Sequence, residues 1–442
     1  MLLSFRFENH RSFRDEAQLN LMPAYASEDR AVRVLGVFGA NASGKSNLIS
    51  ALSFMSGLVG RSDREVEPGL GLRRLSFRLD PRIEAKPSSY VVDLLLNNVR
   101  HTYGFTISDE RVLDEWLYSY PLGPRRKLFE RHEDQYSWGE RSKGSPLEGL
   151  ADITASTALF LSVTARFGRF ENRPPDDEFA DGIFNHFHQV YRWLWQRVAR
   201  AYPSAERIGD RRISRIEDLL LSDSRRFRVI VDLLRSADLG LLDMSLVISE
   251  DEESLSGGEI VEPGQSSTIS SASRRLLERP RLQFHHRGAV GDVLSSVGDE
   301  SDGTMRLLDL ATQALSTLDS GGLLLVDEID ASLHPLLTAR LIELFQSKRV
   351  NRNNAQLLFT SHDAVLLGSL DGVEVLDRDQ IWFVEKGEAG ASILYSLVEF
   401  KPRKQDENRQ RRYLSGKYGA VPDVSLAIFE HALQSRSNDI EH

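Results

Sequence analysis

One glycine-rich segment constrains the fold of this chain more than any other part of its sequence. Residues Gly39–Ser46 (GANASGKS) match the pattern G-x-x-x-x-G-K-[ST]. They follow an apolar, strand-like run, Val32–Phe38, and precede Leu48–Leu58, in which the apolar residues have helical spacing. A strand, a loop and a helix in this order place backbone N–H groups around phosphate oxygens. The sequence therefore predicts a nucleoside triphosphate site in an α/β fold.

Each residue type in this phosphate loop has a chemical reason to be there. Glycines let the backbone curl, Lys45 reaches the β- and γ-phosphates, and the Ser46 hydroxyl can ligate Mg²⁺. The alternative, a glycine turn with a surface lysine, is disfavoured by the flanking strand and helix. ATP and Mg²⁺ are the expected ligands. The expected contacts are Gly39, Asn41, Ala42, Ser43, Gly44, Lys45, Ser46 and Asn47.

Two carboxylates follow a second apolar strand much later in the chain. Leu323–Val326 runs directly into Asp327 and Glu328. In phosphate-loop enzymes the first acid supports the Mg²⁺ shell, and a second acid can polarise a water for attack on the γ-phosphate. The next strand-like run, Gln356–Thr360, leads to His362, which we expect to contact the γ-phosphate. Strands and helices alternate here, which predicts a parallel sheet with both faces covered.

These motifs, in this order, resemble those of ATP-binding-cassette ATPases, specifically the SMC/RecF-like branch. The resemblance implies that a second subunit completes each ATP site with a serine–glycine signature, so a homodimer or higher homo-oligomer is expected. The segment Leu255–Glu259 (LSGGE) has the familiar letters, but Ser256 lies 71 residues before Asp327 and no helix follows. Ser301 and Gly303, within ESDGTMR, lead directly into a predicted helix and then the acid strand. We therefore predict that they form the signature.

The N-terminal segment Asn9–Phe13 (NHRSF) also looks like the opening of that branch. The resemblance implies that Arg11 and Ser12 approach the nucleotide, and a surface arginine in a hairpin is the alternative. One departure concerns the glutamine that this branch places after its first ATPase segment. No glutamine occurs between residues 18 and 135, so we expect a residue near Arg78–Asp80 to replace it.

The overall pattern is most similar to compact AAA family ATP-binding proteins of prokaryotic anti-phage defence systems, such as the ATPase of PARIS and the ATPase part of OLD and Gabija proteins. The similarity covers roughly residues 1–105 and 290–425 and includes the late segment Arg412–Pro422. Because little chain follows the ATPase motifs, the resemblance implies a separately encoded effector, a Toprim-like nuclease. A RecF-like DNA-repair or DNA-binding ATPase is the alternative.

Composition narrows the functional classes further. The chain has 442 residues, no cysteine and a net charge of −10, which excludes disulfides, thiolate metal sites and cysteine nucleophiles and disfavours a general nucleic-acid coat. The basic run Lys401–Arg412 is the expected place for nucleic acid or an effector to bind, with a solvated surface as the alternative. No signal-like or membrane-length apolar run occurs, so we expect a cytoplasmic location and no membrane contact.

The predicted architecture is an α/β P-loop NTPase of the ABC ATPase type, split by a mostly helical insertion. Within that insertion, Ile183–Tyr202 and Ile216–Leu234 have helical periods, and a polar stretch at 250–273 is the expected tip of a long hairpin. The expected divisions are 1–108 for the N-terminal ATPase half, 109–290 for the insertion, 291–400 for the C-terminal half and 401–442 for a basic tail with a final helix.

Overall fold

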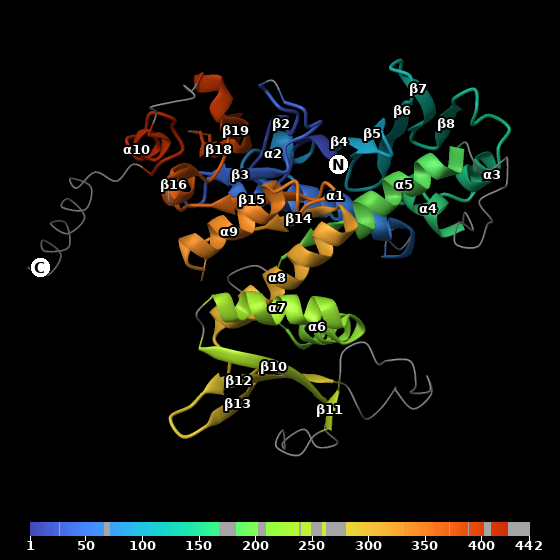
Figure 1. Ribbon diagram of the computed structural model, residues 1–442. Helices are drawn as coiled ribbons and strands as arrows, with labels where there is room; N and C mark the ends of the chain where they lie inside the picture. The colour runs from blue at the N-terminus through green and yellow to red at the C-terminus, as the bar shows by residue number, and fades with distance from the viewer. Residues whose placement is uncertain are drawn as a thin grey trace, which may run out of the picture.

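The structure of the protein is a computed structural model, and every structural statement below concerns the residues that it describes (Figure 1). Within them, no helix is both long and apolar enough to cross a membrane. The described residues are 1–25, 27–65, 71–167, 183–201, 209–237, 240–248, 259–261, 280–331, 333–370, 372–387, 389–401 and 408–422.

A six-stranded sheet forms the centre of the part of the chain that holds the phosphate loop. Its strand order is β19-β18-β3-β15-β14-β9, and all strands run parallel except the edge strand β19. The near-continuous apolar runs predicted for a parallel sheet with covered faces are found in β3, β14 and β15, which are buried throughout. The strands are β3 (Val34–Phe38), β9 (Val198–Arg200), β14 (Leu323–Val326), β15 (Gln356–Ser361), β18 (Ile381–Lys386) and β19 (Ser392–Ser396).

Helices cover both faces of this sheet. Alternate strand residues point to opposite sides, and the central strands are apolar on both sides, so each side needs a covering layer. Leu35 and Val37 share a core with α1 (Lys45–Glu65) and α5 (Ile183–Gln196). Val34 and Phe38 share a second core with α8, α9 and a short 3-10 helix. The α/β fold predicted from the sequence is therefore confirmed. The elements of the second face are α8 (Asp302–Ser320), α9 (Pro335–Gln346) and η3 (Ala364–Leu367).

A seven-stranded antiparallel sheet, in the order β2-β1-β4-β5-β6-β7-β8, packs on the first of these cores. Strands β4 and β5 form a hairpin that turns at Asn97-Asn98, and both asparagines have the positive φ that a two-residue hairpin turn requires. The elements are β1 (Leu2–Glu8), β2 (Ala17–Asn20), β4 (Ser88–Leu96), β5 (Val99–Ile107), β6 (Val112–Tyr120), β7 (Arg126–His132) and β8 (Gln135–Trp138), with α3 (Leu147–Asp152) and α4 (Phe160–Phe167) nearby.

The antiparallel sheet continues past residue 108, where the sequence placed the end of the N-terminal half. Strand β6 pairs with β5 along nearly its whole length, so 112–138 belongs to the same sheet. The predicted helix Ile183–Tyr202 also ends early, at Gln196, because Val198–Arg200 pairs with β14 as an edge strand. The described residues of 109–290 thus contribute strands to both sheets in addition to helices.

The rest of that stretch, together with β13, forms an inserted module against α8. The predicted helix Ile216–Leu234 is two helices, because the Asp223 side chain accepts hydrogen bonds from Arg225 N and Arg226 N and begins a second helix. Strands β10 and β12 pair antiparallel, as expected for the arms of the predicted hairpin. Within its expected tip at 250–273, residues 259–261 form β11, which pairs with β10, and the rest lies outside the described residues. In Figure 1, α8 lies between this module and the parallel sheet. Its elements are α6 (Asp210–Ser222), α7 (Ser224–Ser236), β10 (Leu241–Ile248), β11 (Glu259–Val261), β12 (Arg281–Arg287) and β13 (Asp292–Ser296).

The C-terminal segment 408–422 packs on the parallel sheet. Tyr413 and Tyr418 both stack on Phe383 of β18 with ring centroids 5.6 Å apart. Arg409 of the predicted basic run is buried and donates to Leu376 O at 2.8 Å, so it stabilises the fold. The predicted final helix near 424–434 lies outside the described residues. The remaining elements are α2 (Pro81–Glu84), β16 (Ser369–Leu370), β17 (Val373–Glu374), η4 (Arg378–Gln380), η5 (Leu397–Phe400) and α10 (Arg409–Leu414).

Candidate functional site

The phosphate loop connects the end of β3 to the first residue of α1. Gly44 has a φ of 116°, and a Cβ there would lie 2.2 Å from Ser392 Oγ and 2.7 Å from Ser12 Oγ. A Cβ at Gly39 would lie 2.3 Å from Val384 O. Both glycines are therefore required by close approach of neighbouring strands, and the loop sits against β18 and β19.

The Lys45 ammonium lies across the inside of this loop. Its Nζ donates hydrogen bonds to Gly39 O at 2.7 Å and to Ala40 O at 3.0 Å. Burial lowers the pKa of Lys45, while the carboxylates of Glu328 and Asp327 act in the opposite direction. A buried cation at the N-terminus of a 21-residue helix is an environment suited to a polyanion.

The predicted magnesium residues come together across 281 positions of sequence. Ser46 Oγ donates to Asp327 Oδ1 at 3.0 Å. The Thr360 hydroxyl, at the end of the neighbouring strand β15, donates to the same Oδ1 at 2.7 Å. The carboxyl ends of the parallel strands β3, β14 and β15 meet at one edge of the sheet, which is why these three oxygens converge.

Glu328 is held by its backbone in a conformation uncommon for a residue with a side chain. Its φ is 51°, its N–H donates to Thr360 Oγ1 at 2.8 Å, and its carbonyl accepts from Arg306 Nη2 at 2.8 Å. Arg306 also donates to Asp327 O at 3.2 Å. Burial lowers the pKa of Arg306, and Glu328 and Asp330 oppose that shift. The backbone of the acid pair is thus held by Thr360 of β15 and by Arg306 of α8.

His362 lies beyond the end of β15, on the same edge of the sheet as the acid pair. Its Nε2 is 3.1 Å from Asp330 Oδ2, and its side chain is about half exposed. The other carboxylate oxygen of Asp330 is buried without a hydrogen-bond partner among the described residues. The structure therefore places His362 in reach of the acid segment, with its ring accessible from outside.

The N-terminal motif NHRSF contacts the phosphate loop through Ser12. Ser12 Oγ accepts from Asn47 Nδ2 at 2.7 Å and lies 2.7 Å from Ser392 Oγ. Ser392 Oγ also lies 2.5 Å from Ser43 O, so β19 is joined to the loop. Arg11 has a positive φ of 51° and an exposed side chain, and its approach to a nucleotide stays a prediction.

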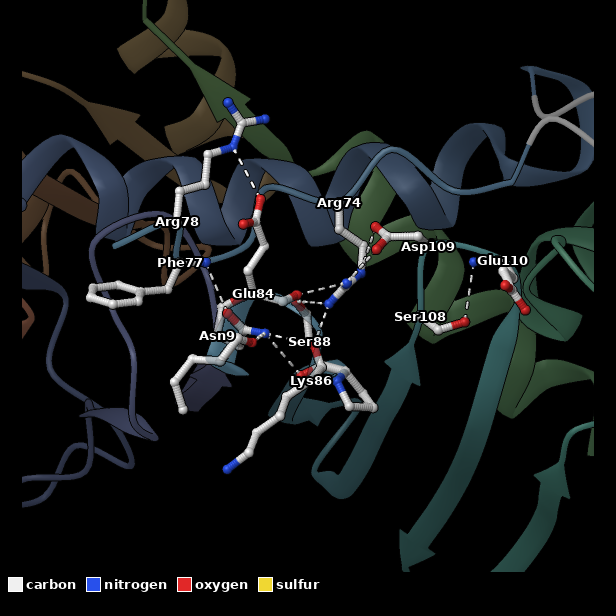
Figure 2. Close-up of polar contacts among 12 residues, drawn as sticks. Asn9, Arg74, Phe77, Arg78, Glu84, Lys86, Ser88, Ser108, Asp109 and Glu110 are labelled. Atoms are coloured by element: carbon white, nitrogen blue, oxygen red, sulfur yellow. Dashed lines mark hydrogen bonds and ion pairs between the residues drawn. The ribbon is translucent and has the colours of Figure 1, made fainter. Parts of the chain in front are cut away.

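Asn9, from the same motif, organises the segment that was expected to replace the glutamine loop (Figure 2). Its Nδ2 donates to Ile83 O at 2.9 Å and Lys86 O at 2.7 Å, and its Oδ1 accepts from Phe77 N at 2.9 Å. Buried Arg74 continues this network through Asp109, with an Nη2–Oδ2 distance of 2.6 Å. Together, these hydrogen bonds hold the segment in place.

The residues near Arg78–Asp80, expected to replace the glutamine, have structural roles. Asp80 begins helix α2, because its carboxylate accepts from Arg82 N at 3.0 Å. A hydrogen bond from the Arg82 side chain lowers the pKa of Asp80. Arg78 lies 3.9 Å from Glu84, an exposed ion pair. The Asp80 carboxylate is therefore a helix cap, and a second metal contact from this segment stays a prediction.

The predicted signature stands at the N-terminus of α8. Ser301 is the N-cap, and its Oγ accepts from Thr304 N at 3.1 Å. Gly303 lies in the first turn, and the same helix carries Arg306 to the acid segment. The rejected LSGGE segment falls largely outside the described residues, so the structure does not compare the two.

The donor set of this site fits a Mg²⁺-bound nucleoside triphosphate. Ser46 Oγ and Asp327 Oδ1 supply two hard oxygen ligands, which is the usual protein share for Mg²⁺ bound together with phosphates. No group of three His, Cys, Asp or Glu residues in the described part of the chain could hold a metal by itself. The buried Ser43 Oγ, without a hydrogen-bond partner among described residues, is an additional free donor in the loop.

Comparison with known proteins places the chain in a family. A family model described as "AAA domain, putative AbiEii toxin, Type IV TA system" matches residues 34–368, about three quarters of the sequence. The chain belongs to this AAA domain family. The match runs from the strand before the phosphate loop to the 3-10 helix after His362, so it includes every motif of the site except Arg11 and Ser12.

Among solved structures, the chain is similar to the SMC head domain from Thermotoga maritima. The identity is 14%, the TM-score is 0.40, and the alignment covers 89% of this chain and 98% of that domain. No curated protein matches the sequence.

Sequence reasoning missed several residues that position the members of this AAA-family site. The sequence predicts Thr360 only as the end of a strand, although a hydroxyl beside an acid at neighbouring strand ends is a recognisable signal. Arg306 lies one turn into a helix from which the sequence predicts only Ser301 and Gly303 as site residues. Ser392 carries no local signal, because its role depends on β19 lying beside the loop.

Proposed function

We propose that this AAA-family chain binds ATP with Mg²⁺ at residues 39–47 and hydrolyses it to ADP and phosphate. The observation that carries the proposal is the convergence of Ser46 and Thr360 on one oxygen of Asp327, beside Lys45 in a loop that only glycine backbone can form. Mg²⁺, held by Ser46 and Asp327, would neutralise charge on the β- and γ-phosphates.

Lys45, Glu328 and His362 have different roles in the proposed hydrolysis. Lys45 binds phosphate oxygens, and its present partners, two loop carbonyls, show that it can reach the inside of the loop. The Glu328 carboxylate takes a proton from water as the water oxygen bonds to the γ-phosphorus. The bond from that phosphorus to the bridging oxygen breaks, and ADP leaves with the electron pair. His362 contacts the γ-phosphate and reports its loss through Asp330.

The active unit that we propose is a dimer with ATP between one phosphate loop and the partner's signature. Ser301 and Gly303 stand at the N-terminus of a 19-residue helix, where free N–H groups and the helix dipole attract phosphate. Arg306, on the same helix, is directed to the chain's own acid segment. One helix thus serves two ATP sites, its own through Arg306 and the partner's through Ser301.

A Glu328→Gln variant tests this mechanism. It should bind ATP, lose most turnover and accumulate as an ATP-bound dimer, because only the proton acceptor is removed. Lys45→Ala is the matched control and should neither bind ATP tightly nor dimerise. Hydrolysis by Glu328→Gln at the wild-type rate would refute the role of Glu328.

The biological role that we propose is control of a separately encoded effector, a Toprim-like nuclease, in an anti-phage defence complex. The family description, which names a putative AbiEii toxin, supports a role in defence or toxicity. The alternative is a RecF-like DNA-binding ATPase, with contact through the basic run near Lys401. Purification from the native operon should yield a co-purifying protein. ATP hydrolysis stimulated by DNA in a salt-dependent way, with no such protein, would favour the alternative.

A further inference from the structure

Glu300, the residue before the proposed signature, is anchored to the inserted module. His286 Nε2 lies 2.6 Å from Glu300 Oε1, and Ser295 Oγ also donates a hydrogen bond to Oε1. The Glu300 side chain is only 5% exposed. His286 pairs with Val293, two residues from Ser295, so both donors lie on one face of the β12–β13 hairpin. A carboxylate in this position is bound by two strands at once.

The anchor acts directly on the end of α8. Ser301 follows Glu300 by one peptide bond, and consecutive Cα atoms are a fixed distance apart, so moving Glu300 moves Ser301. The first turn of α8 is closed by the bond from Thr304 N to Ser301 Oγ at 3.1 Å. The position of the signature serine is therefore determined by the hairpin as well as by its own helix.

The module also holds the body of α8. Met305, Leu308 and Ala311 share a hydrophobic core with α6, α7, β10 and β12. Arg212 of α6 contacts both carboxylate oxygens of Asp309 at 2.7 and 2.9 Å. The hairpin, α6 and α8 thus form one packed unit, in which the anchored residue Glu300 directly precedes Ser301.

We propose that Glu300 is a positioning residue through which the β12–β13 hairpin controls access of Ser301 to the ATP bound by the partner subunit. This inference rests on the proposed dimer. When the carboxylate is bound by His286 and Ser295, the signature is set for the partner's γ-phosphate. When those bonds are lost, the N-terminal turn of α8 is released, while the chain's own phosphate loop is unaffected.

Four full-length variants test the anchor. Glu300→Ala and His286→Ala remove it, and Glu300→Gln keeps an oxygen that can accept from both donors. His285→Ala is the matched control, because His285 makes an equivalent bond, to Ser245 Oγ at 2.8 Å, on the same sheet. The measurements are binding of a fluorescent ATP analogue to the dilute protein, ATP-driven dimerisation, kcat and KM, and the thermal unfolding midpoint.

We expect Glu300→Ala and His286→Ala to lower kcat and ATP-driven dimerisation about tenfold, the scale of one lost charge-assisted hydrogen bond. Affinity for the ATP analogue should stay within about twofold of wild type, since the phosphate loop is intact. Glu300→Gln should recover most of the loss, and His285→Ala should behave as wild type. If Glu300→Ala proves poorly folded, Ser295→Ala should show a smaller loss in the same direction.

Three results would overturn the inference. Wild-type kcat and dimerisation in Glu300→Ala would do so, as would a Glu300→Gln variant that is folded but as impaired as Glu300→Ala. An equal loss in His285→Ala, together with lower unfolding midpoints, would show that only sheet stability matters. Absence of ATP hydrolysis in the wild-type chain would instead contradict the proposed function, so the two failures are distinguishable.

Discussion

Arg306 Nη2 donates a hydrogen bond to the main-chain carbonyl of Glu328 at 2.8 Å, linking α8, whose N-cap is Ser301, to the acid segment. The guanidinium is nine-tenths buried and also reaches Asp327 O at 3.2 Å. Because both acceptors are main-chain carbonyl oxygens, the bonds fix the backbone from which the Asp327 and Glu328 side chains extend. This relationship explains how Glu328 keeps a left-handed backbone conformation that side chains normally avoid.

Replacement of Arg306 should therefore impair turnover more than ATP binding. Arg306→Lys keeps the charge but loses the planar fork, and we expect kcat to fall about tenfold with KM changed less than about twofold. Steady-state ATPase assays check this. The control is Arg340→Lys, on the exposed face of α9, where the arginine forms an ion pair with Glu343. A fall in kcat of the same size in both variants would contradict the role given to Arg306.

Thr360 should be needed for its hydroxyl rather than its shape. Thr360→Val keeps a side chain of similar volume but removes both the donor to Asp327 Oδ1 and the acceptor for Glu328 N. We expect about a tenfold loss in kcat and a higher Mg²⁺ requirement, while Thr360→Ser should retain activity. Titration of ATPase activity with Mg²⁺ is the measurement. A valine variant with the wild-type Mg²⁺ dependence would show that Thr360 does not orient Asp327.

Ser392 should affect ATP affinity, because it joins β19 to the phosphate loop. Ser392→Ala removes the hydroxyl that lies 2.5 Å from Ser43 O and 2.7 Å from Ser12 Oγ. Loss of one buried hydrogen bond of about 1 kcal/mol should weaken ATP binding about fivefold without lowering kcat comparably. Calorimetric titration with ATP checks the prediction. Ser396→Ala, four residues further along at the end of β19, is the control, and equal weakening there would contradict it.

Two buried histidines should make the fold sensitive to acid. Burial lowers the pKa of His10 to about 3 and that of His101 to about 4, well below the usual value near 6.5. Between the ordinary pKa near 6.5 and the lowered pKa of each histidine in the folded chain, the unfolded chain binds protons that the folded chain does not. The free energy of unfolding therefore falls as the pH decreases from about 6.5.

Each histidine should contribute up to about 1.4 kcal/mol per pH unit within its window. His10→Gln should therefore flatten the dependence of unfolding free energy on pH between about 6 and 4, and denaturant unfolding at several pH values measures the slope. His132→Gln, at an exposed position, should leave the slope in that range nearly as it is in the wild type. An unchanged slope in His10→Gln would show that His10 does not titrate on unfolding.

The parts of the site that could be predicted are those written in contiguous residues. Val34–Ser46 and Leu323–Glu328 each combine an apolar strand with the functional residues that follow it, so the local sequence pattern agrees with the place of each strand in the sheet. His362 could be predicted for the same reason, since it follows β15 directly.

The parts that could not be predicted depend on pairing between distant segments. Ser392 reaches the loop only because β18 adds to β3 and turns back as β19. Val198–Arg200 has a helical pattern in isolation and becomes a strand by pairing with β14. Asp223 ends one helix and begins the next with its side chain, an N-cap signal present in the sequence that periodicity alone overlooked.

In the proposed dimer, each ATP site combines the phosphate loop of one subunit with the signature of another. Lys45→Ala and Ser301→Ala should each be nearly inactive alone, while Ser256→Ala should hydrolyse ATP as the wild type does. Mixing the first two in equal amounts creates heterodimers in which one site is intact.

The most direct test is therefore the ATPase rate of that mixture. Each mixed dimer has one intact ATP site of two, and fully random pairing would make half of the dimers mixed. We therefore predict a rate above that of either variant alone and no higher than about a quarter of the wild-type rate. A rate no higher than the average of the two separate variants, with exchange of subunits verified, would contradict a site shared between subunits.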